Sequence, residues 1–325
     1  MTRNQIIYKA SKFFGGSIIT RYLTRSHPRI LMYHRISENG KSGSISAHKF
    51  NEQMRIIKKY FNPMSLNKLV ELYDKGQLPN YAVAITFDDG YRDFAEYAFP
   101  ILKNEKIPVT LFVTTGFING DLWLWPDCLK YIIDKEPVKI KWIIKELSKD
   151  IKVSDNNHDL WNEVADYCMT IPESEKNIFI DKLYDYAQLE KPKKAPEGYR
   201  PLSWEQLKEM RKYGLEIGSH SHTHPILTQL TPEELSYELE VSKQQISQNL
   251  YLDPVAFCYP NGLPGDFNND IEKATENAGY KYALAAFPGR YPIENRWAIN
   301  RYASSESEEN FKKVLFGWTY LGMKV

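Results

Sequence analysis

The sequence predicts an α/β fold, a parallel sheet or barrel that is interrupted once by a helical insertion. Short apolar runs rich in β-branched and aromatic residues alternate with helix-like segments along most of the chain, which is typical of parallel α/β folds. The alternation stops only over residues 119–197. Without this stretch and the N-terminal residues 1–29, roughly 220 residues remain, which suits one barrel of seven or eight strands.

Seven apolar runs are the candidate strands, and the segments between most of them have the spacing of helices. Two of these helices begin with capping boxes, Ser203 with Gln206 and Thr231 with Glu234, which satisfy free N–H groups of the first turn. The predicted strands are 30–34, 82–87, 109–114, 215–218, 255–259, 282–286 and 297–301, and the predicted helices are 46–60, 65–75, 91–104, 203–213, 232–250 and 268–278.

Residues 119–197 are predicted to form an insertion in the barrel. This polar and aromatic stretch shows no strand pattern, but it shows helical patterns at 127–134 and 162–187. We therefore expect a basic N-terminal segment, residues 1–29, followed by a barrel over residues 30–325 that the insertion interrupts.

The charge of the chain excludes some classes of partner. The net charge of +1 provides no field that would attract a nucleic acid. Residues 1–29 carry six basic residues and no acidic one, and we expect them to contact an anionic membrane peripherally. Their apolar runs are too short for a secretory signal or a membrane span. Three widely spaced cysteines fit a reducing, cytoplasmic compartment, with the membrane contact at its inner face.

Two adjacent carboxylates follow the second predicted strand. The apolar run 82–87 ends in Asp88 and Asp89, and the carboxyl ends of parallel strands are where sites form in such folds. A single Asp here would be explained as a helix N-cap. Two in succession after a buried strand are explained as well by a functional site as by an N-cap.

Three alternating histidines, His220, His222 and His224, follow another predicted strand. In an extended segment all three imidazoles would face one side, whereas in a helical turn His220 and His224 are neighbours and His222 faces away. The i, i+4 pair holds a single ion more naturally. We predict a divalent metal site, with Zn²⁺ as the expected ion, on Asp89, His220 and His224, a set that leaves positions open for water.

Short motifs at these two places carry a resemblance to a known family. Residues 86–90 read Thr-Phe-Asp-Asp-Gly, residues 220–224 read His-Ser-His-Thr-His, and both are similar to motifs of the polysaccharide deacetylases, the NodB-homology or family 4 carbohydrate esterases. Residues 258–262 resemble the third motif, Arg-x-Pro-x-Gly, except that Cys258 replaces the arginine, and Arg301 is the candidate substitute. The resemblance implies a distorted (β/α)7 barrel of NodB-homology type.

The same resemblance indicates His34 as the catalytic acid. The family's late Leu-x-His motif is absent, since no histidine follows His224. Residues 30–36 instead match the first strand of a permuted subgroup, similar to the bacterial exopolysaccharide deacetylases, in which this histidine comes from the N-terminal side. A barrel closes its first strand beside its last, so His34 would occupy the same position in space.

The resemblance implies a metal-dependent hydrolase that removes acetyl groups, chiefly N-acetyl groups, from a cell-surface polysaccharide or its precursor. Asp88 would act as general base, and the backbone N–H of Asn261 would stabilise the oxyanion. Protonated His34 would deliver a proton to the departing amine. The candidate sugar contacts are Tyr259, Trp123 and Trp125.

Two other functions fit part of the same pattern. Iron(II) oxygenases also use two histidines and one carboxylate, but they usually lie on antiparallel double sheets and depend on dioxygen and an oxoacid. A non-catalytic carbohydrate-binding protein on the same fold would need neither Asp88 nor the metal ligands. Retention of both favours an enzyme.

Overall fold

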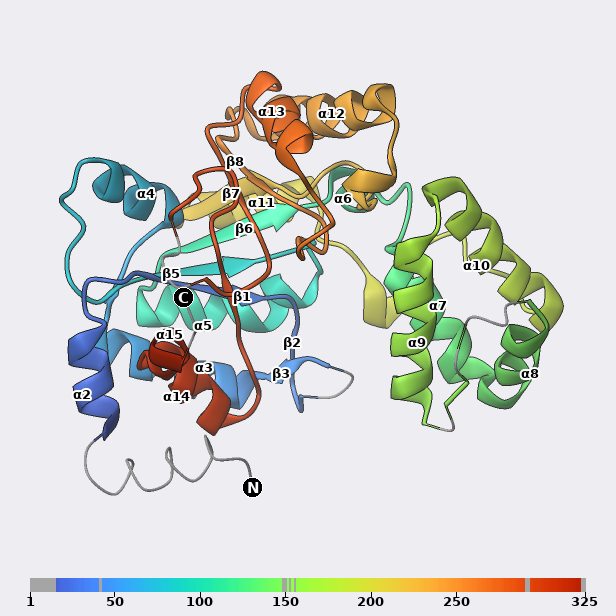
Figure 1. The fold of residues 1–325 in the computed structure, drawn as a ribbon, viewed down its shortest axis with the longest axis horizontal. Helices are drawn as coiled ribbons and strands as arrows, with labels where there is room; N and C mark the ends of the chain where they lie inside the picture. The colour runs from blue at the N-terminus through green and yellow to red at the C-terminus, as the bar shows by residue number, and fades with distance from the viewer. Residues whose placement is uncertain are drawn as a thin grey trace.

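The computed structural model describes residues 16–40, 43–147, 151, 153–154, 156–289 and 293–322. Seven parallel strands form its centre, with helices around them (Figure 1). The strands pair in the order β10-β1-β5-β6-β7-β8-β9. They are β1 (Arg29–Tyr33), β5 (Ala82–Phe87), β6 (Val109–Val113), β7 (Leu215–Ser219), β8 (Ala256–Cys258), β9 (Tyr282–Leu284) and β10 (Tyr302–Ala303).

One segment closes the ring of strands. Ile299 pairs with Leu284 of β9, and Tyr302 pairs with Leu31 of β1, so residues 299–303 lie between the two ends of the sheet. The architecture is therefore the distorted (β/α)7 barrel that was predicted. The last predicted strand, 297–301, is wrong in its bounds, because the chain crosses from one neighbouring strand to the other there and only residues 302 and 303 pair regularly.

Helices cover the outside of the barrel, and both predicted capping boxes are present at their starts. The predicted helix 91–104 begins with a π-helical turn, Phe94–Ala98, and continues as α5, whose first turn contains Pro100. The barrel helices are α3 (Ala47–Tyr60), α4 (Leu66–Asp74), α5 (Phe99–Glu105), α6 (Thr115–Asn119), α11 (Trp204–Arg211), α12 (Pro232–Leu250) and α13 (Asn269–Asn277), and the short strands are β2 (Ile36–Ser37), β3 (Ile45–Ser46) and β4 (Asn62–Pro63).

The insertion forms a helical lobe beside the barrel (Figure 1). Its described residues hold four helices, two more than predicted. The pattern 162–187 is broken at Pro172, because the residue before a proline avoids the helical conformation, and residues 137–147 form a further helix. The lobe has its own apolar core. Its helices are α7 (Trp125–Lys135), α8 (Pro137–Leu147), α9 (Asn157–Thr170) and α10 (Glu173–Ala187).

The two ends of the described chain pack together. Helix α2 (Gly16–Leu23) contacts α15 (Trp318–Gly322), which follows α14 (Glu308–Leu315). Nε of Arg29 donates to the carbonyl oxygen of Leu315 at 3.1 Å, and the Arg29 side chain is fully buried. The prediction that all six basic residues of 1–29 face a membrane is therefore wrong for Arg29, whose charge serves this packing.

The remaining basic residues of the segment divide into two groups. The guanidinium of Arg21 lies 3.7 Å from the centre of the Tyr81 ring, and that of the half-buried Arg25 lies 4.2 Å from the centre of the Tyr22 ring. The other three, Arg3, Lys9 and Lys12, lie outside the described residues. Within the described parts of the chain, no helix has the length and apolar character needed to cross a bilayer.

Candidate active site and metal centre

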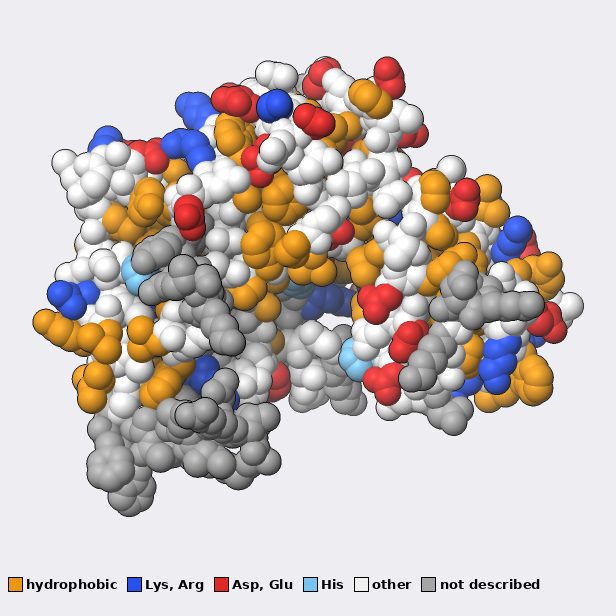
Figure 2. Space-filling view, viewed as in Figure 1, with side chains coloured by type: hydrophobic (Ala, Val, Ile, Leu, Met, Phe, Trp, Pro, Cys, Tyr) orange, Lys and Arg blue, Asp and Glu red, His pale blue; other side chains and the backbone are white. Residues whose placement is uncertain are grey.

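The predicted site residues meet at the carboxyl ends of the barrel strands. Asp88 and Asp89 follow β5, His220 and His224 follow β7, and His34 follows β1. Figure 2 shows a hollow between the barrel and the insertion, with histidine visible in it. The five side chains line one cavity of about 230 Å³. Its lining is His34, Asp88, Asp89, Tyr91, Leu124, Pro126, Trp161, His220, His224, Tyr259, Asn261 and Ala286.

Asp89, His220 and His224 form a compact, buried donor cluster. Oδ1 of Asp89 lies 3.5 Å from Nε2 of His220 and 3.5 Å from Nε2 of His224. All three ligand atoms lie within 4.8 Å of one another. Tetrahedral bonds of about 2.0–2.2 Å to one ion place ligand atoms roughly 3.4 Å apart, so the cluster has the size of a zinc site.

The turn after β7 brings the two histidines together in a way that differs from the expectation. Ser221 and His224 have φ angles of +64° and +61°, so the segment is neither the extended strand nor the helical turn that the sequence left open. The backbone N–H of His224 donates to Oγ of Ser221 at 3.0 Å, which stabilises the turn. Asp89 also has a positive φ, +73°. Left-handed backbone at non-glycine residues costs energy and concentrates at functional sites.

The surroundings of the cluster suit a cation. Nδ1 of His220 lies 2.7 Å from the carbonyl oxygen of Cys258, an acceptor for its N–H, so Nε2 is left with a lone pair toward the cluster. Burial lowers the pKa of His220 to about 4 and that of His224 well below its ordinary value, so both rings are neutral. Burial, and then the Asp88 charge, raise the pKa of Asp89. A divalent ion would relieve the cost of burying this carboxylate, so the donor set fits one.

His222 points away from the cluster, as predicted. Its Nδ1 lies 2.9 Å from Oγ1 of Thr115, and its ring packs edge-on against Tyr237. Its backbone N–H donates to Glu238 at 2.7 Å. His222 therefore ties the loop to α6 and α12.

Asp88 is paired with Arg301, the candidate substitute for the missing family arginine. Two guanidinium nitrogens of Arg301 donate to the two carboxylate oxygens, each at 2.7 Å, and both side chains are buried. Burial alone would raise the pKa of Asp88, but the charge and hydrogen bonds of Arg301 outweigh it and lower the pKa below its ordinary value. Cys258, at the family's arginine position, lies beside the pair and accepts from Arg301 at 2.9 Å. Arg301 lies just before β10, not at the end of a strand as expected.

His34 and Asn261 border the same cavity. Nε2 of His34 lies 3.8 Å from Oδ2 of Asp88, and the His34 side chain is 47% exposed, so it can reach a bound molecule. Asn261 follows β8 with a φ of +55°. Its backbone N–H has no hydrogen-bond partner among the described residues, so it can donate to an oxygen of a ligand.

The three aromatic residues predicted to stack on sugar are buried. Trp123 and Trp125 are 7% and 8% exposed and pack in the core of the insertion. Tyr259 borders the cavity but is fully buried: its hydroxyl donates to the carbonyl oxygen of Trp297, and its ring stacks on Phe267. Their burial does not support the stacking role.

Sequence reasoning missed the side chains that the insertion adds to the cavity. Leu124, Pro126 and Trp161 line it together with the barrel residues. Tyr91 also lines it, and its hydroxyl donates to Asp127 of α7 at 2.7 Å. No local pattern marks these positions, because the insertion meets the barrel only in the folded chain.

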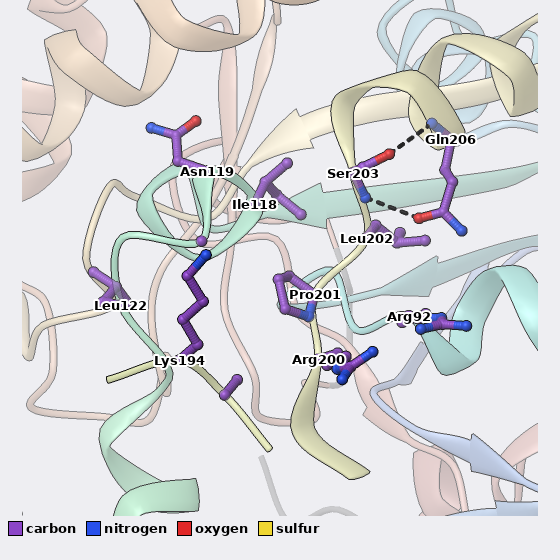
Figure 3. Close-up of a pocket in the computed structure, with 12 residues that line it drawn as sticks. Arg92, Ile118, Asn119, Leu122, Lys194, Arg200, Pro201, Leu202, Ser203 and Gln206 are labelled. Carbon is purple, nitrogen blue, oxygen red and sulfur yellow. Dashed lines mark hydrogen bonds between the residues drawn. The ribbon is translucent and has the colours of Figure 1, made fainter. Parts of the chain in front are cut away.

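A second hollow lies where the insertion joins the barrel (Figure 3). It has a volume of about 490 Å³, the Lys194 side chain reaches into it, and the Ser203–Gln206 capping box lies at its edge. None of the metal-cluster residues lines it, so it is distinct from the candidate active site.

The sequence was compared with models of known protein families, and the family that matches is the one whose motifs the site residues resemble. The family model described as polysaccharide deacetylase matches residues 75–283, more than half of the chain. The poly-β-1,6-N-acetyl-D-glucosamine N-deacetylase of Staphylococcus aureus (strain N315) is 25% identical over 185 residues, which are 56% of this chain and 62% of that enzyme. YxkH of Bacillus subtilis (strain 168) is 33% identical over 88 residues, 27% of this chain and 30% of that protein. The matches thus span less than two thirds of each relative.

Two solved structures share the fold. IcaB from Ammonifex degensii has a TM-score of 0.60 at 17% identity, with 90% of this chain and 97% of that chain covered. The Streptococcus pyogenes deacetylase PplD, in complex with acetate, has a TM-score of 0.59 at 20% identity, with 89% and 98% covered. The parallel barrel is not the antiparallel double sheet expected of an iron oxygenase, which removes that alternative.

Proposed function

Because the chain belongs to the polysaccharide deacetylase family, we propose that it hydrolyses acetyl groups, chiefly N-acetyl groups, of a cell-surface polysaccharide or its precursor. The name of the S. aureus relative, an N-deacetylase of poly-β-1,6-N-acetyl-D-glucosamine, supports this substrate class. One observation carries the proposal: Asp88, held by Arg301, stands beside the three-residue donor cluster in a single cavity. A base and a metal site are then within reach of the same substrate group.

The donor cluster would hold the metal of the proposed enzyme. Asp89, His220 and His224 offer one oxygen and two nitrogens, for which we propose Zn²⁺. When bound there, the ion supplies Lewis acidity, which polarises a carbonyl and lowers the pKa of a water. Because the pKa of His220 is about 4, protons do not compete for its nitrogen at neutral pH.

Asp88 is the general base of the proposed reaction. As a water attacks the acetyl carbon, Asp88 takes its proton. The bidentate contact with Arg301 keeps Asp88 ionised and fixes both of its oxygens. Arg301 is thus a positioning residue, since it acts through Asp88.

Two further groups complete the reaction. The backbone N–H of Asn261 would donate to the oxyanion that forms from the acetyl carbonyl. The carbon–nitrogen bond then breaks, and protonated His34 would give its proton to the departing nitrogen, so that the products are acetate and an amine. An unprotonated amine is a poor leaving group, so His34 matters more for an amide than for an ester.

Metal analysis of the purified protein combined with acetate release tests the proposal. We expect one zinc ion per chain and acetate release from N-acetylated saccharides, with loss of activity in a chelator and recovery when zinc is returned. A panel of N-acetylated and O-acetylated saccharides identifies the preferred linkage. If zinc-loaded protein released no acetate from any of them, the proposed function would be wrong.

Variants test the separate roles of the donor cluster and the base. We expect Asp89→Ala, His220→Ala and His224→Ala each to lose the metal. His222→Ala, a matched control in the same loop, should retain most of it. Asp88→Asn should keep the ion but lower turnover by about a hundredfold or more, as expected for loss of a general base. Equal metal loss in all four alanine variants would contradict the ligand set.

We also propose that the N-terminal segment attaches the protein peripherally to an anionic membrane at the cytoplasmic face. The apolar side chains Ile18, Ile19, Tyr22 and Leu23 of α2 are exposed, and the segment carries an excess of positive charge. Exposed apolar and basic residues together favour the interface of an anionic bilayer.

A further inference from the structure

The insertion supplies one wall of the catalytic cavity. Leu124 and Pro126 lie at the start of α7, and Trp161 lies on α9. The metal donors and Asp88 come from the loops that follow strands β5 and β7 of the barrel. A substrate in the cavity therefore contacts polar, reacting groups on the barrel side and apolar groups on the insertion side.

Trp161 differs from the other tryptophans of the insertion. It is partly exposed at the cavity, whereas Trp123 and Trp125 are buried in the core of the lobe. Trp142, on α8, is 68% exposed and does not line the cavity. Among these four residues, Trp161 is the one that lines the candidate active site.

The orientation of the Trp161 ring is set by a hydrogen bond. Its Nε1 donates to the carbonyl oxygen of Pro126 at 3.0 Å, which links α9 to the start of α7. The indole N–H is thereby satisfied inside the lobe, so the indole offers the cavity an apolar surface. A ring held in one orientation loses little conformational entropy when a ligand packs against it.

The lobe also contacts the barrel close to the reacting groups. The side-chain amide of Asn261 donates to the sulfur of Met169, which lies on α9 together with Trp161, at 3.3 Å. Asn261 belongs to the barrel loop after β8 and lines the same cavity. This contact holds α9, and with it Trp161, in a defined position relative to the oxyanion donor.

We propose that Trp161 is a specificity-determining residue on which the sugar ring of the substrate stacks while its acetyl group meets the barrel residues. Pyranose rings present C–H groups on their faces, and these groups pack on aromatic side chains and leave the hydroxyls free to bind water or polar groups. The insertion thereby makes the site selective for acetylated sugars over small acetyl compounds. This inference rests on the proposed function.

Two substrates separate sugar recognition from chemistry. An N-acetylglucosamine oligosaccharide has both the sugar and the acetyl group, whereas 4-nitrophenyl acetate has an acetyl group without a sugar. We expect Trp161→Ala to lower the ratio of kcat/KM for the saccharide to that for the aryl ester by about tenfold, chiefly through KM. Trp161→Phe, which keeps an aromatic face, should retain most of the ratio. Trp142→Ala is the matched control and should leave it unchanged.

Saccharide binding gives a readout that does not require turnover. Isothermal titration of the purified protein with the oligosaccharide should show about tenfold weaker binding for Trp161→Ala than for the wild type or Trp142→Ala. Wild-type binding without any acetate release would contradict the proposed function and leave the role of Trp161 standing. Equal affinities of wild type and Trp161→Ala, or no wild-type binding, would overturn the inference.

Two alternatives to the proposal, a purely structural role for Trp161 and a different binding site for the sugar, predict different results in these assays. If Trp161→Ala lowered both activities equally together with the melting temperature, the ring would support the lobe and the inference would be wrong. If Lys194→Ala, in the hollow of Figure 3, weakened saccharide binding and Trp161→Ala did not, the sugar would bind in that second hollow. That result would also overturn it.

Discussion

The pair of Asp88 and Arg301 allows a quantitative test of how the barrel holds its base. Arg301 is fully buried and donates to both oxygens of Asp88, to the carbonyl oxygen of Ala285 at 2.9 Å and to Oγ1 of Thr86 at 3.2 Å. The substitution Arg301→Met keeps much of the volume of the side chain but removes its charge and these donors. Asp88 then remains as a buried carboxylate without its cation.

The expected cost follows from the burial of both partners. Breaking a buried ion pair by removing one charge costs roughly 3–5 kcal/mol, because the other charge is left uncompensated. The substitution Asp88→Asn leaves Arg301 in the same position and should also be strongly destabilising. The double variant removes both charges, so it should be more stable than the sum of the single losses implies, by on the order of 2–3 kcal/mol.

Urea unfolding followed by circular dichroism measures these free energies. The four proteins of the cycle are compared without metal, in a chelator, so that ion binding does not contribute to the differences. Arg301→Lys serves as a second probe, because it keeps a charge but loses the bidentate geometry and should fall between wild type and Arg301→Met. Additive losses, with a coupling below about 0.5 kcal/mol, would refute the argument that Arg301 stabilises the Asp88 carboxylate.

Three further predictions concern the acid, a buried carboxyl group and the N-terminal segment. His34→Ala should lose hydrolysis of N-acetyl saccharides while keeping much of the hydrolysis of O-acetyl esters, and undiminished rates on both would place the acid elsewhere. Burial raises the folded-state pKa of Asp127 to about 6 from 3.8, so the folded protein holds this proton more tightly and loses stability as pH rises from about 4 to 6. Relative to Asp127→Asn, the wild type should lose about 3 kcal/mol of unfolding free energy over that range. If the unfolding free energies of the two proteins changed in parallel with pH, this prediction would be wrong. Deletion of residues 1–26 should abolish co-sedimentation with anionic vesicles, which should also weaken with salt, and lack of wild-type binding at low salt would exclude membrane attachment.

The residues whose closeness the sequence predicts are local in the chain. Asp88 and Asp89 are adjacent and directly follow a buried strand, and the three histidines lie within five residues. Residues that are neighbours in the sequence in this way stay close together in any parallel α/β fold that uses these strands. From the sequence, His222 was expected to lie outside the cluster if the segment formed a helical turn. His222 does lie outside the cluster, but left-handed backbone at Ser221 and His224 is what places it there.

The parts that the sequence could not predict depend on distant segments. Arg301 meets Asp88 only because residues 299–303 close the barrel between β9 and β1. Sequence reasoning named Arg301 for its type and region, but nothing in the local pattern showed a bidentate contact. The burial of Trp123 and Trp125 was equally beyond the sequence, because it depends on how the helices of the insertion pack around them.

The sequence by itself determined the alternation of strands and helices, the helix caps, the donor types and the family resemblance, because each of these is encoded in neighbouring residues. Only the tertiary structure decided which cation neutralises Asp88, that Trp123 and Trp125 are core residues, and that Trp161 of the insertion lines the same cavity as the metal cluster. The physical reason is that burial and ion pairing are set by contacts between segments far apart in the chain. Such contacts exist only once the barrel has closed and the insertion has packed beside it.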